Sequence, residues 1–239
     1  MNNSTSLEDK LGFRFKDPSI LTRALTHRSY LNENPDMALE DNERLEFLGD
    51  AVLDFLVGAY LYHRFPEVDE GELTSLRAAL VRAHTLADFA REWELGEALL
   101  VGYGESESGG RERIPILCAT FEAVIGAVYL DQGLDRVTSL LNPLIEPALK
   151  TIMAQQLHKD AKSEFQVWVQ ARESITPHYK VVATAGPDHA RAFTVSVLVG
   201  EKVWGTGEGS SKQAAAQAAA RQALLLAEDV EDEDFNNGG

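Results

Sequence analysis

Three carboxylates stand close together in the stretch "NERLEFLGD", residues 42–50. The apolar spacing of this stretch indicates a helix, and on a helix Glu43, Glu46 and Asp50 fall within roughly 60° of one another around the axis. Like charges at helical spacing destabilise a helix by roughly a few tenths of a kcal/mol per pair, and by more where water is excluded. The helix N-terminus favours an anion at Glu43, but Asp50 lies beyond the first turn. The arrangement therefore indicates that a cation binds beside these side chains.

A further carboxylate, Glu122, stands in the otherwise apolar run "ILCATFEAVIGAVYL", residues 116–130. A helix that is apolar nearly all round is buried. A lone ionised carboxylate in it costs roughly several kcal/mol unless it is neutralised, paired or bound to a metal. The small residues Ala119, Ala123, Gly126 and Ala127 permit a close approach to another helix. We therefore expect this helix to pack against a helix over residues 43–64, so that Glu122 joins Glu46 and Asp50.

Three convergent oxygen ligands with no His or Cys suit Mg²⁺ or Mn²⁺. The chain contains no Glu-x-x-His motif, which argues against a di-iron bundle. Carboxylate-held Mg²⁺ commonly serves phosphodiester hydrolysis, because the ion activates water and stabilises the leaving oxygen. The alternative is a metal-free network of ion pairs through Arg44 or Arg77.

The elements that must position these side chains are helices. Residues 1–152 form the first expected domain, which is all-α, with helices over residues 7–11, 19–26, 43–64, 70–81, 83–92, 117–131 and 134–152. The Gly- and Ser-rich segment "VGYGESESGGRER", residues 101–113, is expected to be a flexible surface loop.

The apolar period changes after a polar linker over residues 153–158. Residues 159–227 are expected to form a small α+β domain of order α-β-β-β-α, whose middle strand carries Phe193, Val195, Val197 and Val199 in alternation. Its last helix is alanine-rich and begins after Ser210 or Ser211. Residues 228–239 contain six acids and no basic residue, and we expect them to form a disordered acidic tail.

The composition constrains compartment and partners. One cysteine, Cys118, rules out a disulfide framework and favours a reducing compartment. The polar N-terminus lacks the pattern of a signal peptide, and the run 116–130 is too short to span a bilayer, so we expect a cytoplasmic protein with no membrane partner. The net charge of −16 lies mostly outside residues 158–227, which carry eight Lys and Arg against six Asp and Glu and can therefore bind a polyanion.

The motifs resemble those of the ribonuclease III family over nearly the whole chain. "NERLEFLGDAVL" (42–53) looks like the family signature, and "LTHRSY" (25–30), "FPEVDEGELTSLRAALV" (65–81), "LADFARE" (86–92) and "FEAVIGAVYLDQG" (121–133) follow in the family's order. The α-β-β-β-α segment resembles the double-stranded-RNA-binding domain of the bacterial members. The resemblance implies a homodimeric, Mg²⁺-dependent endonuclease that cuts both strands of double-stranded RNA, including precursors of ribosomal RNA.

The resemblance also implies roles for single residues. Glu46 and Glu122 match metal ligands, Asp50 matches a catalytic residue near the same ion, and Glu122 shares the catalytic role. Glu43 and Glu70 match auxiliary acids of the catalytic valley. Ala119 departs from the pattern, because the family has an Asp three residues before the Glu that precedes "AVIGA". Either three carboxylates and water suffice, or activity is weakened, or the chain is a non-catalytic protein that binds double-stranded RNA.

The second domain is expected to read RNA by shape, through phosphates and 2′-hydroxyls. Gln166 and the loop residues Pro187, Asp188 and His189 match the family's minor-groove contacts, and Lys212 lies at a helix start that suits a phosphate. Gln213 and Ala216 stand where the family commonly has charged residues. His27 is expected to be a hydrogen-bonded structural histidine.

Overall fold

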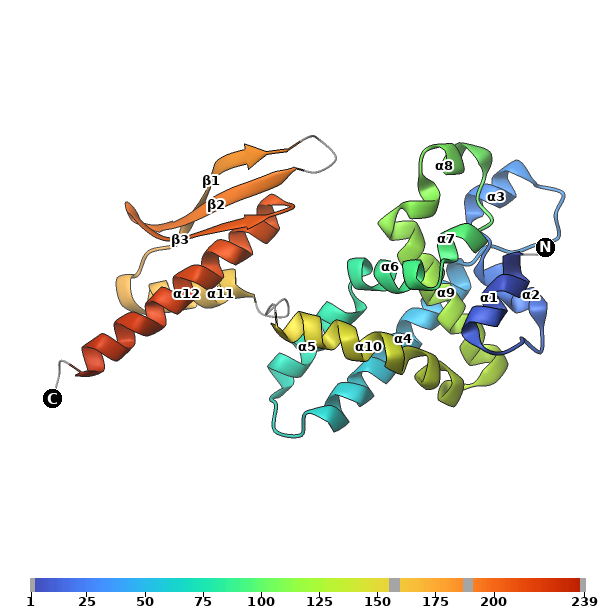
Figure 1. Ribbon diagram of the computed structural model, residues 1–239, viewed down its shortest axis with the longest axis horizontal. Helices are drawn as coiled ribbons and strands as arrows, with labels where there is room; N and C mark the ends of the chain where they lie inside the picture. Colours follow the sequence, from blue (N-terminus) through green and yellow to red (C-terminus); the bar gives the residue numbers. More distant parts are fainter. Residues whose placement is uncertain (1–2, 155–159, 187–190, 237–239) are drawn as a thin grey trace. The chain divides into compact units, whose positions relative to one another are not determined.

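The computed structural model describes residues 3–154, 160–186 and 191–236. The chain divides into two compact units, Met1–His158 and Lys159–Gly239, which correspond to the two expected domains (Figure 1). The last helix of the first unit ends at Ala154, two residues beyond the expected boundary at 152, and most of the expected linker lies outside the described residues.

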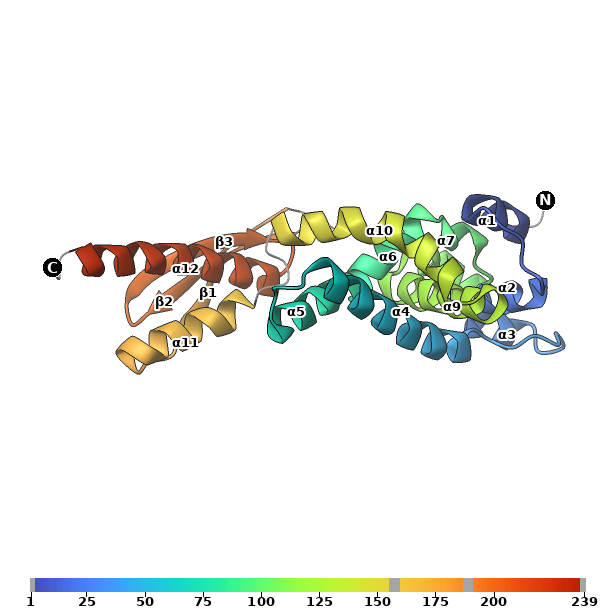
Figure 2. The same ribbon diagram turned by 90° about the horizontal axis from the view of Figure 1, so that it is seen from below.

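The described part of the first unit is helical. Its helices are α1 Asn3–Leu11, α2 Pro18–Ala24, α3 Arg28–Glu33, α4 Glu43–Arg64, α5 Glu70–Val81, α6 Ala83–Glu92, α7 Leu95–Ala98, α8 Tyr103–Glu107, the 3-10 turn η1 Gly110–Glu112, α9 Ile114–Gln132 and α10 Leu134–Ala154. The long helices match the expected ones to within a few residues. In Figure 2, α10 runs along one side of this unit and α4 along the other.

Helix α9 is the centre of the first core, and α4 and α6 pack against it. Helices α4 and α9 touch through their backbones. A Cβ atom added to Gly49 would lie 1.7 Å from the carbonyl oxygen of Glu122, and one added to Gly126 would lie 2.3 Å from that of Leu45. Two glycines facing each other therefore fix the crossing point of α4 and α9, next to the carboxylates.

Helix α9 is also long and apolar enough to cross a membrane, which its expected length of 15 residues did not suggest. Of its most apolar window, 61% is buried inside the protein, as in the core helix of a water-soluble domain.

Residues 101–113 are more ordered than expected. Instead of a flexible loop they contain α8 and η1, and these rest on contacts that a local pattern does not reveal. Glu33 accepts hydrogen bonds from the backbone nitrogens of Tyr103, at 2.6 Å, and Gly104, at 3.3 Å, which caps the start of α8. Arg111 donates to the carbonyl oxygens of Gly96 and Leu99, each at 2.7 Å.

The short helix α3 was not expected either. The His27 ring precedes it, with Nδ1 2.8 Å from the Ser29 hydroxyl, so this histidine is hydrogen-bonded as expected.

The second unit has the expected α-β-β-β-α order. It consists of α11 Ala161–Glu173, the antiparallel strands β1 His178–Ala185, β2 Ala192–Val199 and β3 Lys202–Gly209 in the order β1-β2-β3, and α12 Lys212–Asn236. Added Cβ atoms on Gly205 and Gly207 would lie 2.3 Å and 2.2 Å from backbone atoms of Ala219. The alanine-rich helix therefore lies directly on a glycine-bearing strand. Ser211 caps it by accepting from the backbone nitrogen of Ala214 at 3.1 Å.

Helix α12 continues to Asn236, so the expectation of a disordered tail is wrong for residues 228–236. The physical reason is that no Gly or Pro stands between the alanine-rich segment and Asn236, so the helix, once nucleated, propagates into the acidic stretch.

Candidate active site

Four carboxylates line one pocket in the first unit. Glu43, Glu46, Phe47, Asp50 and Glu122 surround a space of about 540 Å³. Helix α4 supplies all of these residues except Glu122, which comes from α9, so Glu122 lies beside Glu46 and Asp50, as expected from the sequence. Glu70, the first residue of α5, is exposed and is not among the side chains that line this pocket.

Burial and mutual repulsion raise the pKa values of two of these carboxyl groups, those of Glu46 and Glu122. Burial raises the pKa of Glu122 to about 7; the hydrogen bond with Cys118 opposes this rise, whereas the charges of Asp50 and Glu46 add to it. The pKa of Glu46 is raised by burial first and then by the charges of Glu43, Asp50 and Asp41. Around these two carboxyl groups the pocket is therefore short of positive charge.

The alternative network through arginine is not formed in the described part of the chain. Arg77 faces Asp54, with Nε 3.9 Å from Oδ1, and Arg44 is exposed and forms no ion pair with the pocket carboxylates. Of the carboxylates in the pocket, Glu43 has a basic partner, because Nη1 of Arg28 lies 3.1 Å from its Oε1. That pair is exposed, and it leaves Glu46, Asp50 and Glu122 to be neutralised by something else.

The donor atoms fit a hydrated divalent ion better than a tightly caged one. Among the described residues, no three His, Cys, Asp or Glu side chains already stand in a geometry that would hold an ion directly. Mg²⁺ usually keeps several waters and binds proteins through one or two carboxylates, so three facing carboxylates need not all reach it. The oxygen-rich, negatively charged pocket is chemically compatible with Mg²⁺.

Two residues of α9, Cys118 and Ala119, lie one turn before Glu122. Ala119 is half-buried, so the position of the missing family Asp is partly open to solvent. The thiol of Cys118 lies 3.5 Å from Oε1 of Glu122, and burial, followed by the charge of Glu122, raises its pKa to about 12. Neither Cys118 nor Gly49 was expected to take part in this site. The signal for Gly49 was a glycine inside an otherwise strong helix pattern, which often marks a close approach.

The second unit places two of its expected RNA contacts on its surface. Gln166 is exposed on α11 and Lys212 is exposed at the start of α12. Pro187, Asp188 and His189 lie outside the described residues.

A helical unit with an acidic pocket, followed by an α-β-β-β-α unit, defines a nuclease joined to a double-stranded-RNA-binding domain. Residues 17–149 match the family described as Ribonuclease-III-like, and residues 161–226 match the double-stranded RNA binding motif. The chain belongs to the ribonuclease III family and is a double-stranded-RNA-specific endoribonuclease.

The sequence of this chain aligns with those of the ribonuclease III relatives over nearly their whole length. The chain is 49% identical over 220 residues to Ribonuclease 3 of Roseiflexus sp. (strain RS-1), which covers 91% of this chain and 93% of that protein. It is 47% identical over 221 residues to Ribonuclease 3 of Pelotomaculum thermopropionicum, with 92% of each chain covered. A solved nuclease domain of ribonuclease III from Campylobacter jejuni is 43% identical, with a TM-score of 0.56 over 62% of this chain and 96% of that one. Another structure of that domain concerns flexibility in a region involved in dimer formation.

Proposed function

We propose that Glu46, Asp50 and Glu122 hold the Mg²⁺ ion at which this enzyme hydrolyses phosphodiester bonds of double-stranded RNA, with Mn²⁺ as a substitute. The observation that carries the proposal is the meeting of these three carboxylates from α4 and α9 in one pocket. The negative charges of these carboxylates repel one another in the metal-free protein, and the same charges attract a divalent cation. Neither Arg44 nor Arg77 pairs with them.

The residues have different tasks in this site. A bound ion supplies activation of water and stabilisation of the leaving oxygen. Glu122 is the deeper ligand, because it is half-buried, and its pKa of about 7 lets it release a proton near neutral pH as a cation arrives. Asp50 is exposed, where it faces an approaching phosphate and water. Glu46 lies one turn before it and completes the set.

The alternative function is a binding protein without catalysis, and Ala119 is the feature that favours it. We favour the enzyme because the three other carboxylates keep a common pocket and Mg²⁺ accepts water in place of a protein ligand. The test is incubation of a long RNA duplex with the full chain, with and without Mg²⁺. Fragments only in the presence of Mg²⁺ are the expected result, whereas an intact duplex that the protein nevertheless shifts on a gel would identify the binder.

The proposal includes a homodimer in which each subunit cuts one strand. Phe47, Phe55 and Tyr62 project from α4 with 80%, 61% and 68% of their surfaces exposed. These large side chains form an apolar face of α4 that lies outside the hydrophobic core. An isologous contact between two copies of the chain would cover this face. Sedimentation equilibrium at micromolar concentration is expected to give twice the chain mass; a monomer would contradict this part.

We further propose that Gln166, Lys212 and the loop residues Pro187, Asp188 and His189 hold the duplex. A domain that reads shape accepts any sufficiently long base-paired stem, which suits precursors of ribosomal RNA and other structured transcripts in the cytoplasm. Lys212→Gln is expected to weaken duplex binding by severalfold and to reduce its salt dependence, as the loss of one phosphate contact does. The matched control is Lys180→Gln on β1, which removes the same charge elsewhere on this unit.

A further inference from the structure

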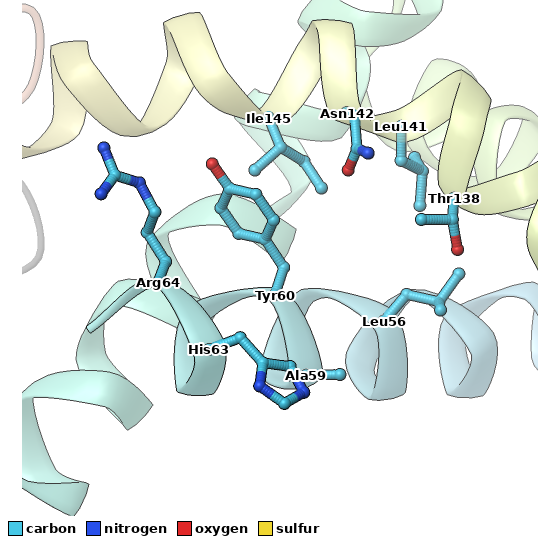
Figure 3. Close-up of a pocket in the computed structure, with 9 residues that line it drawn as sticks. All are labelled: Leu56, Ala59, Tyr60, His63, Arg64, Thr138, Leu141, Asn142 and Ile145. Carbon is cyan, nitrogen blue, oxygen red and sulfur yellow. The ribbon is translucent and has the colours of Figure 1, made fainter. Parts of the chain in front are cut away.

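A second pocket lies between α4 and α10, further along α4 than the carboxylates. Its volume is about 420 Å³. Figure 3 shows Leu56 and Tyr60 rising from α4 toward Leu141 and Ile145 on α10, so that apolar side chains form two facing walls. Leu141 and Ile145 are buried and Leu56 and Tyr60 are half-buried. The space is therefore a structured apolar hollow within the size range of small-molecule sites.

Two small side chains account for the hollow. Ala59 lies between Leu56 and Tyr60 on α4, and Thr138 lines the opposite wall on α10. The Thr138 hydroxyl is occupied, because it donates to the carbonyl oxygen of Leu134 at 2.9 Å. A larger apolar side chain at either position would fill the space.

The charges gather at the Tyr60 end of the pocket. The Tyr60 hydroxyl donates to Glu146 at 2.5 Å, and Nζ of Lys150 lies 3.3 Å from the other oxygen of Glu146. These hydrogen bonds lower the pKa of Glu146, so this carboxyl group is ionised at neutral pH. Arg64 lines the same end and reaches over the Phe65 ring, with its guanidinium carbon 5.6 Å from the ring centroid. Two cations around one carboxylate leave a net positive charge there.

We propose that this pocket binds a small amphipathic oxyanion, with its apolar body between α4 and α10 and its anionic group at Arg64. An apolar cavity with one charged end favours a ligand built in the same way, because the body is removed from water while the anion stays at the rim. Positive charge at the rim is unusual in this unit, which carries 14 Lys and Arg against 26 Asp and Glu over residues 1–157. The pocket is separate from the carboxylate site and does not depend on its chemistry.

A matched pair of fluorescent probes tests the proposal on the full chain. The probes are 1-anilinonaphthalene-8-sulfonate and N-phenyl-1-naphthylamine, which share one aromatic skeleton and differ in the anionic group. The sulfonate is expected to bind at one site per chain and about tenfold more tightly than the neutral probe, the ratio that roughly 1.4 kcal/mol of charge interaction gives. Equal affinities would show that Arg64 does not select an anion.

Two charge variants and two variants that fill the pocket locate the binding. Arg64→Gln is expected to weaken the sulfonate about tenfold and leave the neutral probe unchanged, whereas Arg136→Gln, an exposed arginine of α10 outside the pocket, changes neither. Ala59→Leu fills the hollow from α4 and is expected to abolish binding of both probes. If that variant does not fold, as circular dichroism would show, Thr138→Leu fills the pocket from α10. A folded filled variant that binds both probes like the wild type would overturn the proposal.

Competition identifies the anionic group. Nonanoate and octyl phosphate carry the same eight-carbon alkyl chain. Displacement of the sulfonate probe by either one supports the site and shows whether a carboxylate or a phosphate is preferred. Octylamine is the control with the opposite charge. Displacement by octylamine as strong as by both anions would contradict the proposed charge selection.

Discussion

Gly49 of α4 presses against the backbone of Glu122 on α9 so closely that a Cβ atom at position 49 would lie 1.7 Å from the Glu122 carbonyl oxygen. This contact brings the backbone of the deeper carboxylate to within one turn of Glu46 and Asp50 along α4. The glycine therefore has a positioning role, although it carries no functional group.

Gly49→Ala is expected to destabilise the protein by roughly 2–3 kcal/mol or more, because backbone would have to move to admit the methyl group. Gly58→Ala in the same helix is the matched control. Its added Cβ would meet nothing closer than the Arg77 side chain at 3.9 Å, so the better helix propensity of Ala is expected to stabilise the fold by up to about 1 kcal/mol. Urea unfolding measures both, and equal stabilities would contradict the close contact.

Catalysis and RNA binding are expected to separate by mutation. Asp50→Asn and Glu122→Gln each remove a proposed ligand and are expected to reduce cleavage to background, while duplex binding stays within about twofold, since phosphate contacts of the other unit supply most of the affinity. Asp54→Asn, on the same helix but outside the pocket, is the control. A cleavage assay and a gel shift on one duplex check this, and near wild-type cutting by either ligand variant would refute the site.

The pH dependence of the metal-free protein reports on Glu122. Its folded pKa of about 7 is above the ordinary value of 4.5, so the folded state holds the proton more tightly than the unfolded state. The stabilisation is complete below pH 4.5 and is lost as the pH rises through 7. With EDTA present, the melting temperature is expected to fall between pH 5 and 8, relative to Glu122→Gln over the same range.

Mg²⁺ should cancel this loss, because binding to the ionised carboxylates stabilises the folded state. If the wild type and Glu122→Gln follow the same pH course in EDTA, the raised pKa is wrong.

The long helices could be predicted because the apolar side chains recur with helical periodicity. The packing of α4 against α9 could be predicted because Glu122 is a carboxylate in an otherwise apolar helix and needs partners. The short helices α3, α7 and α8 were not predicted. Helix α8 depends on a distant partner, because Glu33 accepts a hydrogen bond from the Tyr103 backbone, and α7 is contacted by Arg111, which donates to the carbonyl oxygen of Gly96. The role of Gly49 depends on where two helices cross, and a linear sequence does not state a crossing point. The pocket between α4 and α10 likewise depends on how two helices pack, which the linear sequence does not state.

The first unit is expected to carry the cleavage activity, and the second unit is expected to supply most of the affinity for RNA. Deleting residues 159–239 removes one compact unit and leaves the other whole, so the remaining chain is expected to fold and dimerise. That chain is strongly acidic, and it is expected to cut duplex RNA only at low salt and high enzyme concentration, because few phosphate contacts remain. Cleavage measured from 50 to 200 mM salt checks this, and a truncated enzyme as salt-resistant as the full chain would contradict it.

Ala119 is where the chain departs from its family, and Ala119→Asp tests what the departure does. Residues 119 and 122 are three apart on α9, so an aspartate at 119 lies on a face neighbouring that of Glu122 and can reach an ion held there. Because Ala119 is half-buried, the new carboxylate keeps some contact with water. A fourth carboxylate adds negative charge to the site, so the Mg²⁺ concentration for half-maximal cleavage is expected to fall severalfold, with duplex binding unchanged.

Ala119→Asn separates charge from size, because it has the same shape without the charge. It is expected to leave the Mg²⁺ requirement as in the wild type. The competing interpretation treats Ala119 as a small packing residue, and it predicts that both variants lower the melting temperature equally and that Mg²⁺ does not restore it. Metal titrations of cleavage together with thermal melts in EDTA and in Mg²⁺ decide the matter. If aspartate destabilises the fold without any gain in metal affinity, position 119 lies outside the reach of the ion.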